Sequence, residues 1–267
     1  MKRMFTSLFI AGIILFLTGC HIAGGDMAEY YSERFLREKG EPERLIQAIH
    51  GRKPLPPETF QRLTDYSDRA VNRMLAENPA CPPKLLQKFS ESRDWYVRRG
   101  VACNPNASYD LLKKLSRDSN DQVRVSLGMN PAIPEDIRNY FVDAGDWYAQ
   151  DGLARNPSTP PDMLRKIYNR YKESSQHRID LSFALNPKLP EDIARDIYLR
   201  EKDRSFSVAL QYIAMNPATP SSLLLDIYRD NRSDIRLIQY AQNPNCPEEI
   251  KEDIRNSHDH TAKELLK

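Results

Sequence analysis

Glycine, histidine, cysteine and long apolar runs are all scarce in this chain. It has 10 glycines, 5 histidines and 4 cysteines in 267 residues. It contains no glycine-rich phosphate loop, no His-Glu-x-x-His pair and no Gly-x-Ser-x-Gly nucleophile turn. Its single long apolar run, from Phe5 to Leu17, excludes a membrane protein with several spanning helices. These absences remove the commonest nucleotide-binding, metalloprotease and hydrolase classes.

An excess of charge of one sign is also lacking. The chain has 39 Lys and Arg against 37 Asp and Glu, which gives a net charge of +2. Electrostatic binding to nucleic acid normally requires a clear basic excess, so no nucleic-acid partner is expected. The hydrophobic fraction of 40% is large enough for a folded core.

The first twenty residues have the features of an export signal. Lys2 and Arg3 precede the apolar run, which ends in Leu17-Thr18-Gly19-Cys20. This ending resembles the lipobox of bacterial lipoproteins. The resemblance implies that residues 1–19 are removed and that Cys20 is lipidated at the start of a tether over residues 20–26. It also implies the outer membrane, facing the periplasm, because His21 and not aspartate follows the cysteine. An ordinary signal peptide with an incidental cysteine is the alternative.

Three cysteines remain once Cys20 is assigned to the anchor, and they are Cys81, Cys103 and Cys246. Their odd number and the absence of a Cys-x-x-Cys pair argue against a metal cluster or a redox pair. We expect each to be a small buried apolar side chain. A disulfide between Cys81 and Cys103, which lie in adjacent repeats, stays open.

Proline is abundant instead, and its placement reveals an internal repeat. There are 19 prolines, and seven of them follow an asparagine at Asn78, Asn104, Asn130, Asn156, Asn186, Asn216 and Asn243. These asparagines are spaced by 26, 26, 26, 30, 30 and 27 residues. A second proline stands four residues after each asparagine, except where Ser108 takes its place. A fixed period of this length is typical of stacked repeats.

The apolar residues of each repeat predict two short helices. Apolar side chains recur seven and three residues before the asparagine, and again seven and eleven residues after it, as at Val123, Leu127, Ile137 and Phe141. The Asn-Pro-x-x-Pro segment would form the corner between the helices, with the asparagine satisfying backbone groups there. One such pair cannot bury its apolar face, so the repeats must stack. A helical bundle with coincidental Asn-Pro turns is the alternative.

The sequence therefore predicts an all-α solenoid of about eight two-helix repeats over residues 52–256. Residues 27–51 would form N-terminal capping helices, and residues 257–267 a polar tail with a weak closing helix. The pattern from Val97 through Asn104-Pro105 to Leu115 resembles the leucine-rich repeat variant family. The resemblance, over roughly residues 40–256, implies a right-handed superhelix, although the repeats here are longer than is usual in that family. HEAT-like repeats are the near alternative. The iron–sulfur cysteines attached to one member have no counterpart, so no cofactor is expected.

No residue cluster predicts catalysis or a metal site. His258-Asp259-His260 is the one histidine cluster, and a complete site needs more ligands. The recurrent acidic pairs, such as Glu135-Asp136, follow the second proline. Acidic side chains are favourable in the first turn of a helix, which explains these pairs without chemistry. We therefore expect a protein that is not an enzyme.

Side chains that vary between repeats are the candidates for partner binding. Both tryptophans occur in equivalent pairs, Trp95-Tyr96 and Trp147-Tyr148, and a second ladder consists of Tyr168, Tyr198 and Tyr228. Tryptophan and tyrosine are favoured anchors in protein interfaces. Ten residues after the asparagine the charge changes sign along the chain, from Lys88, Lys114 and Lys166 to Asp196, Asp226 and Asp253. The alternatives are aromatic side chains that fill gaps between helices and charges that are merely solvated.

Together these features predict a membrane-anchored, non-catalytic protein-binding repeat protein of the bacterial envelope. Its partner would be an unidentified protein or peptide, and its contact with the membrane would be the lipid at Cys20. An immunity-type lipoprotein that neutralises a toxin and a structural envelope or cell-wall scaffold are the alternatives. A hydrolase with unrecognised carboxylates is the remaining enzymatic possibility.

Overall fold

The computed structural model of the chain describes residues 27–174, 179–204, 206–230 and 235–266. Within these residues all regular structure is helical, in eighteen helices, and there is no strand. The chain divides into two compact units that meet in sequence between Ser158 and Thr159. The predicted signal at residues 1–19, Cys20 and the tether over residues 20–26 lie outside the described residues.

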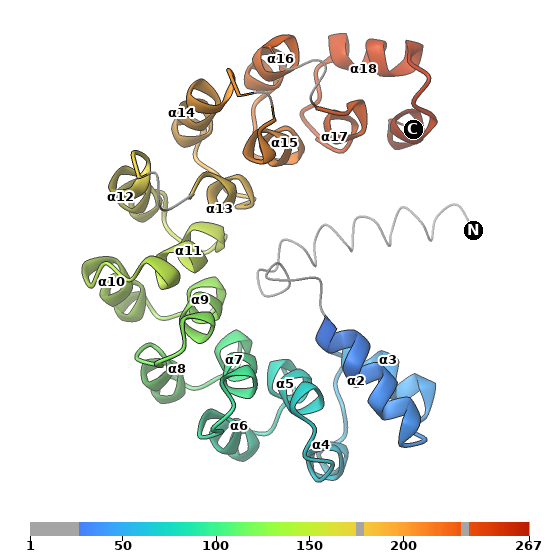
Figure 1. Cartoon of the computed structure of the whole chain (residues 1–267), viewed down its shortest axis with the longest axis vertical. Coiled ribbons are helices and arrows are strands. Elements are labelled where there is room, and N and C mark those ends of the chain that lie inside the picture. Colours follow the sequence, from blue (N-terminus) through green and yellow to red (C-terminus); the bar gives the residue numbers. More distant parts are fainter. Residues whose placement is uncertain (1–26, 175–178, 205, 231–234, 267) are drawn as a thin grey trace. The chain divides into compact units, whose positions relative to one another are not determined.

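The first unit consists of two rows of short helices (Figure 1). Its helices are α2 (Met27–Glu38), α3 (Glu43–His50), α4 (Pro57–Thr64), α5 (Arg69–Glu77), α6 (Pro83–Ser90), α7 (Trp95–Cys103), α8 (Tyr109–Leu115), α9 (Asp121–Met129), α10 (Glu135–Asp143) and α11 (Trp147–Arg155). We call α5, α7, α9 and α11, each of which ends at an Asn-Pro corner, the first row. The helices α4, α6, α8 and α10 form the second row. This alternation is the helix–corner–helix order that the repeat predicts.

The second unit continues the alternation. Its helices are α12 (Pro161–Tyr171), α13 (Asp180–Ala184), α14 (Glu191–Glu201), α15 (Val208–Met215), α16 (Ser221–Asp230), α17 (Leu237–Ala241), α18 (Glu248–Asn256) and α19 (His260–Leu265). Here α13, α15, α17 and α19 form the first row, and α12, α14, α16 and α18 form the second. The division after Ser158 coincides with the change in repeat length from 26 to 30 residues. The extra residues lengthen α12 and α14 to 11 residues each, against 8 for α6 and 7 for α8.

The predicted core is confirmed at the apolar repeat positions. Val123 and Leu127 on α9, and Phe141 on α10, have no exposed surface, and Ile137 is almost as deeply buried. Met163 is an exception among the equivalent residues, because it is only half-buried. The closing helix predicted in the tail is α19, whose Ala262 is fully buried. Period and apolar spacing were therefore sufficient to place the interior.

The second proline of a corner stands directly before the helix that follows. The second proline precedes the first helical residue and does not occupy the first turn, as at Pro134 before α10 and Pro190 before α14. Its backbone is extended, and its carbonyl oxygen accepts the first helical hydrogen bond, from Arg138 N–H to Pro134 O at 3.1 Å for example. Proline has no N–H to leave unsatisfied at this position, which suits it to the start of a helix.

The asparagines form a ladder between repeats. In α9, the buried Asn130 side chain accepts a hydrogen bond from Ala132 N–H at 2.9 Å, which is the predicted role within its own corner. Its Nδ2 also donates to the previous corner, to Ala102 O at 2.8 Å and Asn104 O at 3.0 Å. Equivalent pairs of bonds are donated by Asn104 and Asn156 in the first unit, and by Asn216 and Asn243 in the second.

The small residues allow first-row helices of the first unit to touch through their backbones. A Cβ atom added to Gly152 on α11 would overlap the Val125 carbonyl oxygen on α9. A Cβ added to Gly128 would likewise overlap the Ala149 carbonyl oxygen. Neither glycine has a positive φ angle, so backbone conformation does not require them. The close approach of α9 and α11 does.

Candidate protein-binding surfaces

The tyrosine ladder predicted as a binding surface lies between second-row helices of the second unit. Tyr168, Tyr198 and Tyr228 are 3%, 9% and 3% exposed. Each hydroxyl donates to a carboxylate on the following second-row helix, in the pairs Tyr168–Asp196 at 2.8 Å, Tyr198–Asp230 at 2.5 Å and Tyr228–Asp253 at 2.6 Å. Side chains this buried connect successive repeats and leave a partner little surface, so contact through them stays a prediction.

Burial and an acidic acceptor raise the pKa values of two of these phenols, Tyr168 and Tyr198. Burial, and then the hydrogen bond to Asp196, raises the pKa of Tyr168 above its ordinary value. Burial, and then the hydrogen bond to Asp230, does the same to the pKa of Tyr198. Asp196 and Asp253 belong to the predicted change of charge sign along the chain. These two of the three acidic residues therefore have a structural role, because they supply acceptors for tyrosines, whereas Asp226 lies 3.6 Å from Arg195 Nη1.

The Trp95–Tyr96 pair begins α7 in the first row. Both side chains are half-buried, and their rings meet edge to face with centroids 5.5 Å apart. The guanidinium groups of Arg69 and Arg73 lie over the Tyr96 ring, at 5.0 Å and 4.7 Å from its centroid. These contacts hold Tyr96 against α5, the preceding helix of the first row. Tyr96 therefore has a packing role.

A buried charge network that the sequence analysis missed supports Tyr96. Arg73 is 1% exposed, and its Nε donates to the Glu77 carboxylate at 2.6 Å while its Nη1 donates to the Tyr96 hydroxyl at 2.6 Å. The other Glu77 oxygen accepts from Arg52 Nη2 at 2.8 Å. A buried charge is tolerated only when it is paired in this way. No spacing rule predicted the network, because Arg52 and Glu77 belong to different repeats.

The equivalent Trp147–Tyr148 pair begins α11, two first-row helices away. Trp147 is half-buried, whereas Tyr148 is 42% exposed. The helix α9 between them carries Asp121 and Gln122 at the equivalent positions, so the two aromatic pairs do not form one continuous surface. Of the seven aromatic candidates, Tyr148 presents the most surface to a partner.

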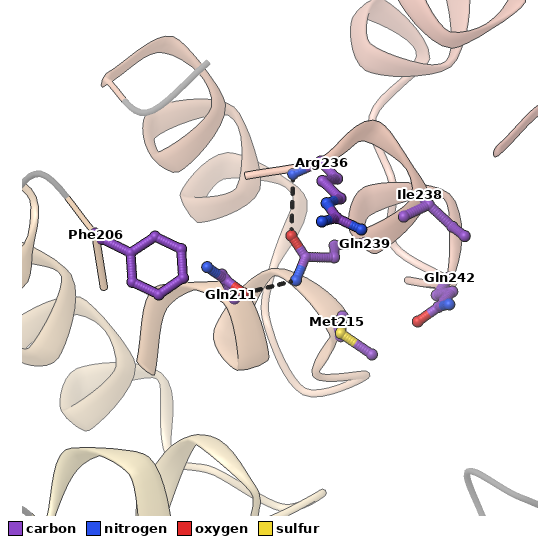
Figure 2. A pocket seen from close by; sticks show the side chains of 7 residues that line it. All are labelled: Phe206, Gln211, Met215, Arg236, Ile238, Gln239 and Gln242. Atoms are coloured by element: carbon purple, nitrogen blue, oxygen red, sulfur yellow. Dashed lines mark hydrogen bonds between the residues drawn. The ribbon is translucent and has the colours of Figure 1, made fainter. Parts of the chain in front are cut away.

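A pocket opens between α15 and α17 on the first row of the second unit (Figure 2). Its volume is about 440 Å³, and its lining residues are Phe206, Gln211, Met215, Arg236, Ile238, Gln239 and Gln242. In Figure 2, Phe206 lies at the left and Gln242 at the right, with Gln211 and Gln239 between them and Arg236 above Gln239. The lining thus combines apolar side chains, amides and one cation, with no carboxylate.

The amides of this pocket are partly fixed. Gln239 Nε2 donates to Gln211 Oε1 at 3.1 Å, and Gln239 Oε1 accepts from the Arg236 backbone N–H at 3.0 Å. Gln242 Oε1 is buried and has no hydrogen-bond partner. A buried acceptor without a donor is costly, so Gln242 Oε1 is a position where a bound group would be favourable.

The pocket occupies repeat positions that sequence reasoning passed over. Gln211 and Ile238 stand five residues before the asparagine of their repeats, and Met215 and Gln242 stand one residue before it. In the first unit the same positions carry Arg73 and Glu77 on α5 and Asp151 and Arg155 on α11, but Val125 and Met129 on α9. These two positions therefore do not by themselves mark the pocket in the sequence.

The described residues contain no cluster that is suited to a metal ion. No group of three His, Cys, Asp or Glu side chains within them is arranged to hold a metal ion. Asp259, the middle residue of the predicted histidine cluster, caps α19 by accepting from Ala262 N–H at 2.9 Å. Cys81 and Cys103 are buried and are not joined by a disulfide, and burial raises the pKa of the Cys81 thiol to about 12. That thiol is therefore a packing group and not a nucleophile.

Of the helices that the structure describes, none has the length and apolar character needed to cross a bilayer. Comparison of the chain with protein-family models, with curated proteins and with solved structures finds no match. The similarities to the lipobox and to leucine-rich repeat variants therefore rest on the residues quoted above.

Proposed function

We propose that this chain is a lipid-anchored, non-catalytic protein-binding solenoid of the bacterial envelope. Its anchor would be Cys20, and its helices would continue as a right-handed stack of about eight repeats. The observation that carries the proposal is the pocket on the first row of the second unit, which is open, amide-lined and apolar and contains no acid–base pair. A repeat stack with such a surface suits the binding of an extended partner.

Crosslinking in cells tests the protein-binding function. A photoreactive amino acid placed at Tyr148 should form one specific adduct with a partner protein, and Trp95→Ala with Trp147→Ala should reduce its yield several-fold. The matched control is Leu199→Ala, which removes a 59% exposed apolar side chain from the second-row helix α14. Equal adduct yields in the parent protein, in the variant with Trp95→Ala and Trp147→Ala, and in Leu199→Ala would remove the aromatic pairs from the binding surface.

Membrane fractionation tests the anchor separately. Cys20→Ser leaves a hydroxyl, which the lipidating enzyme cannot convert to a thioether. The variant should leave the membrane fraction, because no acyl chain would hold it there. A Cys20→Ser protein that still fractionates with the outer membrane contradicts the lipobox interpretation, whatever the crosslinking shows.

A further inference from the structure

We propose that the pocket between α15 and α17 binds an extended peptide segment that carries a carboxylate beside an apolar side chain. The inference rests on the proposed protein-binding function, and it names the site and the chemistry of the partner. Three features of the pocket support it. They are an amide donor and an amide acceptor without partners among the described residues, an exposed apolar wall, and an arginine without an ion pair among the described residues.

The amide groups match the backbone of a peptide. Gln211 Oε1 accepts from Gln239 Nε2, and Gln211 Nε2 makes no hydrogen bond to the described residues. Gln242 supplies the opposite group, an Oε1 that is covered and has no donor among the described residues, so its amide must turn toward the pocket to accept a peptide N–H. One amide donor and one amide acceptor in the same pocket are what a peptide C=O and N–H require. Gln239, whose two amide atoms are both bonded, holds Gln211 in this arrangement.

The apolar wall is left open to solvent. Phe206, directly before α15, is 65% exposed, and Val208 at the start of α15 is 43% exposed. Ile238 and Met215 contribute half-buried apolar surface to the same pocket. Covering an exposed aromatic side chain with another apolar group is favourable, because it removes apolar surface from water. A leucine-sized or aromatic side chain of the peptide would do so.

The charge of the pocket selects an acidic peptide. Arg236 is exposed, and among the described residues its guanidinium makes no ion pair. Among the described residues that line the pocket, no other carries a charge, so Arg236 is their one cation. Guanidinium groups bind carboxylates through two parallel hydrogen bonds, which also orients the ligand. The volume of about 440 Å³ lies within the range of roughly 300–1,000 Å³ that is typical of ligand sites.

Peptide selection on the intact protein tests this inference. A random heptapeptide library displayed on phage is selected on the full-length chain, and the enriched sequences are made as soluble peptides. We expect an Asp or Glu next to a Leu, Ile, Phe or Met in most of them. Phe206→Ala should weaken binding of these peptides at least ten-fold, and Leu199→Ala should leave it unchanged.

A charge-exchange series decides the role of Arg236. Arg236→Gln should weaken binding of an acidic peptide at least ten-fold, and should barely affect the same peptide with Glu replaced by Gln. Arg229→Gln, at an exposed cation of α16 that pairs with Glu249, is the matched control and should have no effect. Phe206 and Arg236 are both exposed, so neither change threatens folding, and circular dichroism of each variant verifies this.

The outcomes separate the inference from the function on which it rests. Selection of basic or uncharged peptides, or equal loss with Arg236→Gln and Arg229→Gln, overturns the inference. Absence of enrichment on the intact chain overturns it too, even if Tyr148 still crosslinks to a partner. Absence of both enrichment and crosslinking rejects the protein-binding function itself.

Discussion

Replacing Asn130 by alanine removes one complete rung of the asparagine ladder. The amide of this side chain donates to Ala102 O and Asn104 O and accepts from Ala132 N–H, and the residue has no exposed surface. The change deletes three hydrogen bonds and leaves the three backbone groups behind. Water does not easily reach the two carbonyl oxygens, which lie between packed repeats, whereas Ala132 is exposed and its N–H can turn to water.

The expected loss of stability depends on which hydrogen bonds the three backbone groups still make after the substitution. Ala102 O has no substitute donor, since Pro105 lacks an N–H and Asn106 N–H already donates to Asn104 Oδ1 at 2.8 Å. Asn104 O keeps a bond from Ala107 N–H at 3.2 Å. A buried group left without a partner costs about 1–3 kcal/mol. One full loss and two partial ones therefore amount to about 2–4 kcal/mol.

Asn106→Ala provides the matched control. Asn106 also donates from Nδ2 to a backbone oxygen of the preceding repeat, Pro79 O at 2.9 Å, but it lies on the surface. Water replaces its bond, so the expected loss is below about 1 kcal/mol. Asn130→Asp should be at least as damaging as Asn130→Ala, because a carboxylate cannot donate to two carbonyl oxygens.

Urea unfolding followed by far-ultraviolet circular dichroism measures these differences. Repeat proteins lose cooperativity when one interface weakens, so the slope of each transition is compared together with its midpoint. A loss below about 1 kcal/mol for Asn130→Ala, or equal losses for Asn130→Ala and Asn106→Ala, would refute the ladder as a stabilising element.

Three further predictions follow from other contacts. Gly152→Ala should destabilise the protein by about 1–3 kcal/mol in urea titrations, because its Cβ would overlap the Val125 carbonyl oxygen; an unchanged midpoint would contradict the close approach of the two helices. Tyr198→Phe should cost about 1–2 kcal/mol at neutral pH. The raised pKa of Tyr198 means that this contribution is present below the unfolded value of about 10 and is lost as pH rises through the folded value. The difference in free energy of unfolding between the parent protein and Tyr198→Phe should therefore disappear in strongly alkaline solution. A difference that does not change with pH would be evidence against a buried, hydrogen-bonded phenol at Tyr198. Burial by itself would raise the pKa of Asp118, but the hydrogen bonds from Arg98 and the Asn120 backbone and the charges of Arg98 and Arg124 together lower it. The contribution of Asp118 is present above the unfolded value of about 4 and disappears as pH falls through the folded value, so Asp118→Asn should destabilise by about 1–3 kcal/mol at pH 7 and not in acid.

The period of the sequence was enough to predict the corners and the core. Val123, Leu127 and Phe141 are buried where the apolar spacing placed them, because helices that bury one face must repeat that face every three to four residues. Asn130 was expected to satisfy backbone groups of its own corner, and it does. These features depend on residues close together in the chain, which sequence patterns represent directly.

The candidate site was less accessible to prediction. Tyr148 and Tyr168 lie on helices that are consecutive in the chain, α11 and α12. Tyr168 is 3% exposed and Tyr148 is 42% exposed. The difference depends on which face each helix turns toward the next repeat. The pocket escaped prediction for the same reason, since Gln211 and Gln242 come from separate repeats and have no distinctive spacing.

The sequence by itself determined the helical class, the corner positions, the apolar interior and the motif that predicts an anchor at Cys20. Only the tertiary structure decided that the asparagines link neighbouring repeats, that the tyrosines are buried donors, and that a pocket opens between α15 and α17. The physical reason is that local spacing fixes which face of a helix is apolar. The distance between stacked helices fixes which polar groups can reach one another, and which are left open to a partner.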